Sequence, residues 1–440
     1  MRDKVIYWSS GCCFFFFFFF YGLWPALGVS FSLLYLGLFV LRLGNKLPVM
    51  ELIAVLAWFQ WVFGAFIAYR MPPSFDKYRM YVDESTYFKI MVPLCLAFSV
   101  GLSFKQNTLD FNQLREHFKE NSNFTLIGTK LIYIGLFAMF FGGYLPSSFR
   151  FFMFLVQGFA YVGVGILTFI NKRQANHYLI VLFALLILNS LRIGMFHDLI
   201  LWGVFFGLFW FIKKEFTVRG KLIIICFGFF TLSTLQAVKG SYRALIRSGS
   251  DENKIALFSS LLFDQIFSEG ADETEISDQN VRLNQGWINS AIIKNVPENE
   301  TFANGETIYE ALSSSLLPRF LNPSKKKAGG QENFRRFTGL PLADNTSMGI
   351  SVAGEAYANF GTIGGVLFMA LWGRVLSFVF SFLINKAQFN PVIIFFVPVI
   401  FFQVVKAETE LVVVLNHLVK ASMVVWMFFW GARNILKWEV

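Results

Sequence analysis

Charged residues, cysteine and histidine are all scarce in this chain of 440 residues. Asp, Glu, Lys and Arg together make up 15% of it, and there are four Cys and four His. A soluble globular domain carries about 25% charged residues, so the low charge excludes that class. All four cysteines lie in apolar runs, which excludes a secreted scaffold held by disulfides.

The chain also lacks the motifs of nucleotide-driven chemistry. It has no P-loop, no dinucleotide-binding glycine fingerprint and no GxSxG nucleophile elbow. The largest polar stretch, residues 238–347, contains neither His nor Cys, so a zinc site built there on imidazole or thiolate is excluded. We therefore expect no metal and no cofactor, and an activated substrate delivered in the membrane must supply the energy of any reaction.

Hydrophobic residues, by contrast, make up 55% of the chain, and Phe alone supplies 57 residues. They form apolar runs separated by short polar loops, the pattern of an all-α polytopic integral membrane protein. We expect about twelve transmembrane helices: a retained first span containing Phe14–Phe20, a second at about 26–41 separated from it by Pro25, and others at about 49–69, 89–104, 125–142, 151–170, 177–190, 197–212, 222–237, 360–384, 390–405 and 411–431.

Three regions follow from this threading. Residues 1–237 form a membrane domain of about nine spans, 238–347 one large external loop, and 348–440 a membrane domain of about three spans. The short loops and tails on one face carry sixteen Lys and Arg against seven on the other. Because cytoplasmic loops carry the excess of basic residues, we expect both termini in the cytoplasm and the large loop outside. The same excess of basic residues in the short loops accounts for the net charge of +10, so we expect no nucleic-acid partner.

Isolated arginines in apolar or Gly-rich context are the first candidate site residues of the large loop. Arg282 lies in Arg-Leu-Asn-Gln-Gly, and Arg319 in Leu-Pro-Arg-Phe-Leu-Asn-Pro. The planar guanidinium group suits phosphate and carboxylate recognition, so converging arginines could hold a lipid diphosphate as it leaves. The alternative is that they form salt bridges that organise the loop. Other basic residues of the loop are Lys239, Arg243, Arg247, Lys325–Lys327, Arg335 and Arg336.

Glu355 lies in the small-residue stretch Gly349–Gly365, at the expected membrane boundary. An unpaired carboxylate is costly there, so Glu355 is a functional candidate with a basic partner expected from the loop. The alternative is an ion pair that fixes the return of the loop to the membrane. The glycines of this stretch allow close helix contact or a re-entrant turn.

A smaller cluster, Arg192-Ile-Gly-Met-Phe-His197-Asp198, lies at the expected outer end of the seventh and eighth spans. Its three ionisable groups face the same side as the large loop. His197 and Asp198 could act in proton transfer, or they could merely cap a helix.

Together these features resemble the bacterial O-antigen polymerases, the Wzy-type polymerases of oligosaccharide repeat units. About twelve spans with one long external loop before the last three are typical of that family. The resemblance in motif is carried by Lys239-Gly-Ser-Tyr-Arg243, Arg282-Leu-Asn-Gln-Gly286, Leu317-Pro-Arg-Phe-Leu-Asn-Pro323 and Gly354-Glu-Ala-Tyr-Ala-Asn-Phe-Gly361.

The resemblance implies a metal-independent, GT-C-like glycosyltransferase of the bacterial inner membrane, working on the periplasmic face. Its substrate would be a polyprenyl diphosphate-linked oligosaccharide, and its partners membrane lipid and a regulator of chain length. Functional arginines of the family correspond most naturally to Arg243, Arg282 and Arg319, and Glu355 and Asp198 are the candidate bases. The candidate site is completed by His197 for proton transfer and by Lys239, Arg192, Arg335 and Tyr357 for substrate binding.

Two other functions compete with polymerisation. An O-antigen ligase shares the architecture but transfers finished polymer onto lipid A-core. A transporter or flippase for lipid-linked sugar would place charges at several mid-span positions and show symmetric halves. Here the charges gather at the outer boundary and no internal repeat is visible, which favours an enzyme.

Overall fold

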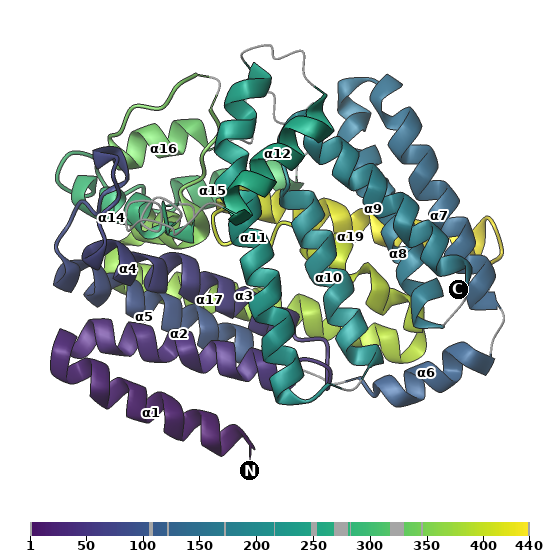
Figure 1. Cartoon of the computed structure of the whole chain (residues 1–440), viewed down its shortest axis with the longest axis horizontal. Coiled ribbons are helices and arrows are strands. Elements are labelled where there is room, and N and C mark those ends of the chain that lie inside the picture. Colours follow the sequence, from purple (N-terminus) through teal and green to yellow (C-terminus); the bar gives the residue numbers. More distant parts are fainter. Residues whose placement is uncertain are drawn as a thin grey trace.

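The structure is a computed structural model that describes residues 2–104, 109–120, 123–170, 173–214, 216–247, 253–267, 280–281, 283–316, 330–344 and 346–438. Over these residues the secondary structure is helical, apart from an isolated bridge between Leu43 and Lys46. Figure 1 shows the helices as one bundle, with α14 and α16 at its upper left and α6 at its lower right. The expected all-α class is confirmed.

Ten helical segments of the described chain are long and apolar enough to cross a membrane, as a multi-pass membrane protein requires. They are α1 (Arg2–Tyr21), α2 (Leu23–Arg42), the continuous α3, η1 and α4 (Val49–Trp58, Phe59–Phe63 and Gly64–Arg70), α5 (Glu84–Ser103), α7 (Asn123–Phe141), α8 (Ser147–Phe169), α9 (Gln174–Ile193), α11 (Val218–Arg247), α17 (Ser351–Phe389) and α19 (Leu411–Asn434).

Two of the twelve expected spans are shorter helices. The expected span at 197–212 is α10 (His197–Lys213), whose 17 residues reach about 25 Å at 1.5 Å per residue. The expected span at 390–405 is the still shorter pair η4 (Pro391–Phe396) and α18 (Val397–Phe401). Both fall below the ~30 Å thickness of a hydrocarbon core.

The N-terminal apolar stretch forms two helices, as expected, but the break lies at Gly22 rather than at Pro25. Gly22 adopts a φ of +79°, a left-handed conformation that costs glycine nothing, and Pro25 lies within the first turn of α2. No residue in the membrane-spanning window of α1 is buried. Helix α1 therefore lies at the edge of the bundle beside α2 (Figure 1).

Glycines bring two pairs of helices into backbone contact. A Cβ atom on Gly101 of α5 would lie 2.3 Å from the carbonyl oxygen of Ala370 in α17, and one on Gly373 of α17 would lie 2.3 Å from that of Phe98. Helices α7 and α8 approach each other in the same way, since a Cβ on Gly135 would lie 2.2 Å from the nitrogen of Ala160. In a membrane such close packing is a main source of helix association.

Helix α17 is bent near its start. Gly361 has φ 63° and ψ −160°, which interrupts the helix between a buried segment, Ser351–Asn359, and the long membrane span that follows. The sequence placed the start of this span at about residue 360. The preceding stretch from Ser351 is also helical, and it packs on α14 (Gly286–Asn295).

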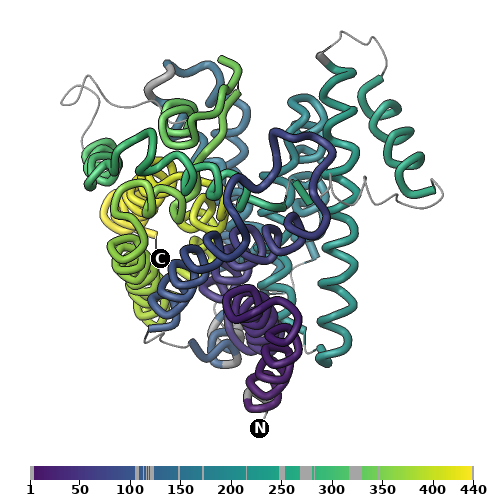
Figure 2. Tube along the Cα trace, turned by 90° about the vertical axis from the view of Figure 1, so that its left-hand side faces the viewer, coloured from purple at the N-terminus to yellow at the C-terminus, as the bar shows by residue number. Residues whose placement is uncertain are grey.

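The remaining helices connect the spans. Helix α11 continues to Arg247, ten residues beyond the expected end of its span, and α12 packs beside its upper part (Figure 2). The expected external loop, residues 238–347, is named the outer segment here. Its described part contributes α12 (Lys254–Phe267), α14, α15 (Glu306–Leu316) and α16 (Gln331–Thr338). The short loops contribute η2 (Asp76–Tyr78), α6 (Phe111–Glu120) and η3 (Gly142–Tyr144).

Two contacts join the outer segment to the loop between α4 and α5 and to the middle of the span Val49–Arg70. The backbone N–H of Tyr81 donates to Ser290 Oγ (3.1 Å), and that of Gln285 donates to the carbonyl of Gln60 (2.9 Å). Tyr81 belongs to the loop between α4 and α5, which charge counting placed on the same side as the large loop. The two loops therefore meet at one end of the membrane helices.

Candidate functional site

The turn between α9 and α10 positions the His197–Asp198 pair. Gly194 ends α9 in a left-handed conformation (φ 68°), so the chain reverses and His197 becomes the first residue of α10. His197 Nε2 lies 2.9 Å from Asp198 Oδ1, with the two side chains 46% and 31% exposed. The two side chains are thus partly exposed and in contact, but Asp198 Oδ1 is itself buried and has no hydrogen-bond partner within the described chain. An imidazole beside a carboxylate is the pair of groups that proton transfer requires.

A cavity of about 290 Å³ opens beside Asp198. It lies among α8, α9, α10, α18 and α19, towards the end of the bundle that carries the α9–α10 turn. Its size is at the lower end of the range of small-molecule sites. The lining side chains are mostly apolar or aromatic, with four strongly polar groups among them: Gln157, Asn189, Asp198 and His417.

The aromatic part of the lining is the stacked pair Tyr161 and Trp202. Their ring centroids lie 4.1 Å apart at an interplanar angle of 20°. Flat rings beside a few polar groups suit a ligand with apolar faces and hydroxyl edges, as a sugar has. The cavity therefore combines aromatic surface with a few polar groups.

His417 gives independent support for a ligand. It lies in α19, is 3% exposed, and its Nε2 contacts the carbonyl oxygen of Val399 at 2.9 Å. Because a carbonyl can only accept, Nε2 must carry the proton, and Nδ1 of the neutral ring is then an acceptor. Within the described chain Nδ1 is buried and has no hydrogen-bond partner. A buried acceptor of this kind is costly unless a ligand or water donates to it.

Basic side chains surround the same turn. Arg243 Nε donates to the carbonyl of Gly194 at 2.7 Å, and the hydroxyl of Tyr242 donates to that of Leu191 at 2.8 Å. Lys239, four residues before Arg243, lies on the same face of α11. Lys406, between α18 and α19, interacts with Asp198; burial lowers the pKa of Lys406 and the carboxylate partly opposes that shift.

Glu355 and Tyr357 lie elsewhere, in the buried segment of α17. Glu355 is 1% exposed, and its Oε2 accepts a hydrogen bond from the backbone N–H of Leu411 at 2.8 Å. A second buried carboxylate, Glu410, accepts from Asn333 Nδ2 at 3.1 Å. The Tyr357 hydroxyl donates to the carbonyl of Val296 at 3.3 Å. These contacts join α17 to the start of α19 and to the outer segment.

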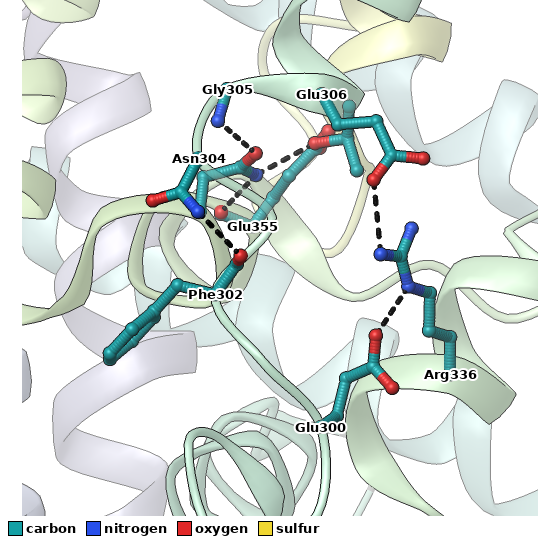
Figure 3. Close-up of polar contacts among 9 residues, drawn as sticks. Glu300, Phe302, Asn304, Gly305, Glu306, Arg336 and Glu355 are labelled. Carbon is teal, nitrogen blue, oxygen red and sulfur yellow. Dashed lines mark hydrogen bonds and ion pairs between the residues drawn. The ribbon is translucent and has the colours of Figure 1, made fainter.

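Arg335 and Arg336 on α16 form ion pairs within the outer segment. Arg336 Nε lies 2.7 Å from Glu300 and its Nη2 lies 3.0 Å from Glu306, as Figure 3 shows. Hydrogen bonds to these two carboxylates raise the pKa of Arg336 above its ordinary value. Arg335 contacts Asp344 at 2.7 Å and the carbonyl of Leu342. Both arginines therefore pair with carboxylates of the same segment, and the substrate-binding role expected for Arg335 stays a prediction.

The predicted site residues thus fall into two groups. The structure brings Arg192, His197, Asp198 and Arg243 together at the α9–α10 turn, whereas it places Glu355, Tyr357 and Arg335 around the buried segment of α17. Arg282, Arg319 and Lys325–Lys327 lie outside the described residues. Among the described residues no cluster of three or more His, Cys, Asp or Glu could hold a metal ion.

Sequence reasoning missed the residues that complete the cavity: Gln157, Tyr161, Asn189, Trp202 and His417. A signal was present, because a polar or ionisable side chain within a membrane span is a functional candidate by default. No family model, curated protein or solved structure matches this chain. Its function must therefore be inferred from the cavity and the side chains themselves.

Proposed function

We propose that the chain is a membrane glycosyltransferase that polymerises lipid-linked oligosaccharide repeat units into a surface polysaccharide, such as O-antigen or capsule. The observation that carries the proposal is the cavity at the outer end of the spans, where Asp198, paired with His197, lies beside the stacked rings of Tyr161 and Trp202. Aromatic rings, a carboxylate and an imidazole at one cavity support a reaction on a sugar hydroxyl.

The reaction transfers the growing glycan from its polyprenyl diphosphate onto the non-reducing end of a new repeat unit. The acceptor hydroxyl attacks the anomeric carbon, a new C–O bond forms, and the bond to the diphosphate breaks. Asp198 accepts the hydroxyl proton, and His197 at 2.9 Å stabilises the carboxylate. The leaving diphosphate takes the electron pair.

Cationic groups would stabilise that leaving group as its charge develops. Arg243 is anchored to the α9–α10 turn through Gly194, and Lys406 interacts with Asp198. Arg192 and Lys239 supply further positive charge near the turn. To Glu355 we assign a positioning role, because its buried carboxylate binds the backbone at the start of α19.

The proposal includes a location and an orientation. The chain would lie in the bacterial inner membrane as a GT-C-like protein of about twelve spans, with both termini cytoplasmic and residues 238–347 in the periplasm. The basic residues of the short loops support this orientation. Its partners would be the polyprenyl diphosphate-linked oligosaccharide, membrane lipid and a regulator of chain length.

Deletion of the gene followed by electrophoresis of the surface glycolipid tests the function. We expect the ladder to collapse to core plus a single repeat unit and to return with the wild-type gene. Asp198→Asn removes the base and should lower polymer synthesis by about 10²-fold or more. Asp76→Asn is the matched control, because Asp76 is 81% exposed and pairs only locally with Arg79.

Other ladders would contradict polymerisation. Long polymer that accumulates on its lipid carrier, with none on lipid A, would identify a ligase. An unchanged ladder would contradict both the polymerase and the ligase function and would favour transport of lipid-linked sugar. Arg282→Ala and Arg319→Ala, tested in the same strain, determine whether these two arginines take part.

A further inference from the structure

Helix α12 is a part of the outer segment that the proposed function leaves unused. It packs on α11 and α9, and Figure 2 shows it beside the upper part of α11. Leu257 and Phe258 form its buried side, at 8% and 9% exposed. The ring of Phe258 stacks on that of Phe196, with the centroids 5.0 Å apart, and meets the ring of Tyr242 at 5.1 Å. The bundle therefore holds this side of α12.

The partners of α12 fix its level along the spans. Phe196 directly precedes α10, and it forms one buried cluster with Phe258, Leu191 and Val238. Leu191 lies in the last turn of α9, and Val238 directly follows the apolar run expected at 222–237. Helix α12 thus contacts the spans where they leave the hydrocarbon core, which is the level of the lipid head groups.

The side of α12 that faces away from the bundle is also apolar. Four large side chains on it are 50% to 67% exposed: Ile255, Phe263, Ile266 and Phe267. With 3.6 residues per turn, these positions share one sector of the helix, opposite the buried side. The rings of Phe263 and Phe267 lie 4.4 Å apart and form one patch. A helix that faced water on this side would carry polar residues there.

Two exposed polar side chains, Ser260 and Asp264, lie one turn apart at the edge between these two apolar sides. Ser259 lies within the outward apolar sector, but its hydroxyl donates to the carbonyl of Ile255 at 2.7 Å, so it needs no water. An apolar sector that borders a polar edge is the pattern of a helix that lies in the plane of a membrane interface.

The two spans that support α12 also present apolar side chains outward. Leu188 of α9 is 52% exposed and Phe230 of α11 is 58% exposed, and both helices are long and apolar enough to cross a membrane. In water the outward side of α12 would be a costly patch of large apolar side chains. Lipid at the boundary of these spans removes that cost, because acyl chains accept apolar surface.

We propose that α12 lies in the membrane interface, with Phe263 and Phe267 inserted among lipid acyl chains and Asp264 facing water. Its partner is the lipid surface on the side of the α9–α10 turn, and this part of the outer segment is a membrane element. The stacking of Phe258 on Phe196 joins α12 to the residue that precedes His197, so lipid helps to hold the turn at a fixed depth. The inference does not depend on the polymerase function.

Spin labels on single cysteines test the inference in the full chain, reconstituted in liposomes of phosphatidylethanolamine and phosphatidylglycerol. The four native cysteines are replaced first. Molecular oxygen concentrates in hydrocarbon, whereas a nickel chelate stays in water. Electron paramagnetic resonance measures how often each reagent collides with the label. The ratio of oxygen to nickel collision rates should be severalfold higher for Phe263→Cys and Phe267→Cys than for Asp264→Cys, the matched control at an exposed position of the same helix.

Phe230→Cys in α11 gives the hydrocarbon reference, and Ser74→Cys, between α4 and α5, gives the aqueous reference. Ile255→Cys and Ile266→Cys repeat the test if a Phe variant does not reconstitute. Nickel collisions on the outward side of α12 as frequent as at Ser74→Cys would place the helix in water and overturn the inference. Low collision rates with both reagents would show that protein, such as a second copy of the chain, covers this side, and would overturn it as well. Neither result depends on the glycolipid ladder.

Discussion

Glu355 Oε2 accepts a hydrogen bond from the backbone N–H of Leu411 at 2.8 Å. The contact joins the buried segment of α17 to the first turn of α19, whose initial N–H groups have no partner within the helix. Both residues are at most 2% exposed. The carboxylate thus caps α19 from another helix.

Substitutions at Glu355 separate a positioning role from a catalytic one. Glu355→Gln keeps an oxygen that can accept from Leu411, so we expect near-normal polymer synthesis. Glu355→Ala leaves a buried donor unsatisfied and should lower the free energy of unfolding by about 1–3 kcal/mol. Thermal unfolding in detergent and the glycolipid ladder measure the two effects. A folded Glu355→Gln protein without activity would instead make Glu355 the catalytic base.

The contact between α5 and α17 should not tolerate a methyl group. In Gly373→Ala the new Cβ would lie 2.3 Å from the carbonyl oxygen of Phe98, so the two helices must move apart. This should lower the free energy of unfolding by about 1–3 kcal/mol. Gly431→Ala in α19 meets open space and should be neutral or stabilising, because Ala favours a helix over Gly. Equal unfolding temperatures for the two variants would contradict the close packing.

The cap of α5 should make stability depend on pH. Thr86 N–H donates to Asp83 Oδ2 at 2.8 Å, which lowers the pKa of Asp83. Because the folded pKa lies below the unfolded value of about 3.9, the stabilisation is present above that value and is lost as pH falls through the folded pKa. Asp83→Ala should therefore lower the free energy of unfolding by about 1 kcal/mol near neutral pH and by much less in acid.

The free energies of unfolding of the wild type and of Asp83→Ala, measured from neutral pH to about pH 3, check this expectation. Asp83→Asn is the control, because its amide oxygen still accepts from Thr86 but does not titrate in this range. A constant difference between wild type and Asp83→Ala at all pH values would show that the carboxylate charge has no part in the cap.

The orientation can be tested with single cysteines at two exposed loop positions, Ser74 and Asn45. The four native cysteines are first replaced, since Cys12 and Cys226 are exposed. A membrane-impermeant maleimide added to cells with a permeable outer membrane should label Ser74→Cys, between α4 and α5, and should label Asn45→Cys only after lysis. The reverse pattern would invert the chain and place the His197–Asp198 pair on the cytoplasmic face.

Much of the membrane architecture follows from hydropathy. The expected spans at 49–69, 125–142 and 151–170 agree with helices to within a few residues, because a chain that crosses lipid must satisfy its own backbone. The ends of α11 and α17 differ, because tertiary contacts decide them. Val238 and Tyr242 are buried against α9 and α12, which extends α11 beyond its apolar run.

The candidate site could be predicted in part: a motif indicates Arg243, but only neighbours in sequence could be predicted to lie in contact. His197 and Asp198 are adjacent, and their place at the end of a span follows from the apolar pattern. Gln157 and His417 lie on helices far apart in the chain, so no spacing relates them to Asp198. Glu355 could be recognised as costly to bury, but its hydrogen bond from the backbone N–H of Leu411 could not be predicted, because no residue pattern indicates a backbone donor.

The exposure of α1 explains how a run of seven identical side chains, Phe14–Phe20, can persist in a folded protein. A packed core requires each side chain to match the shape of its neighbours. Fluid hydrocarbon makes no such demand, and no residue in the membrane-spanning window of α1 is buried. Most of this helix therefore has to be hydrophobic and long enough rather than of one exact shape, while its inner face keeps specific contacts such as Phe17 against Phe66.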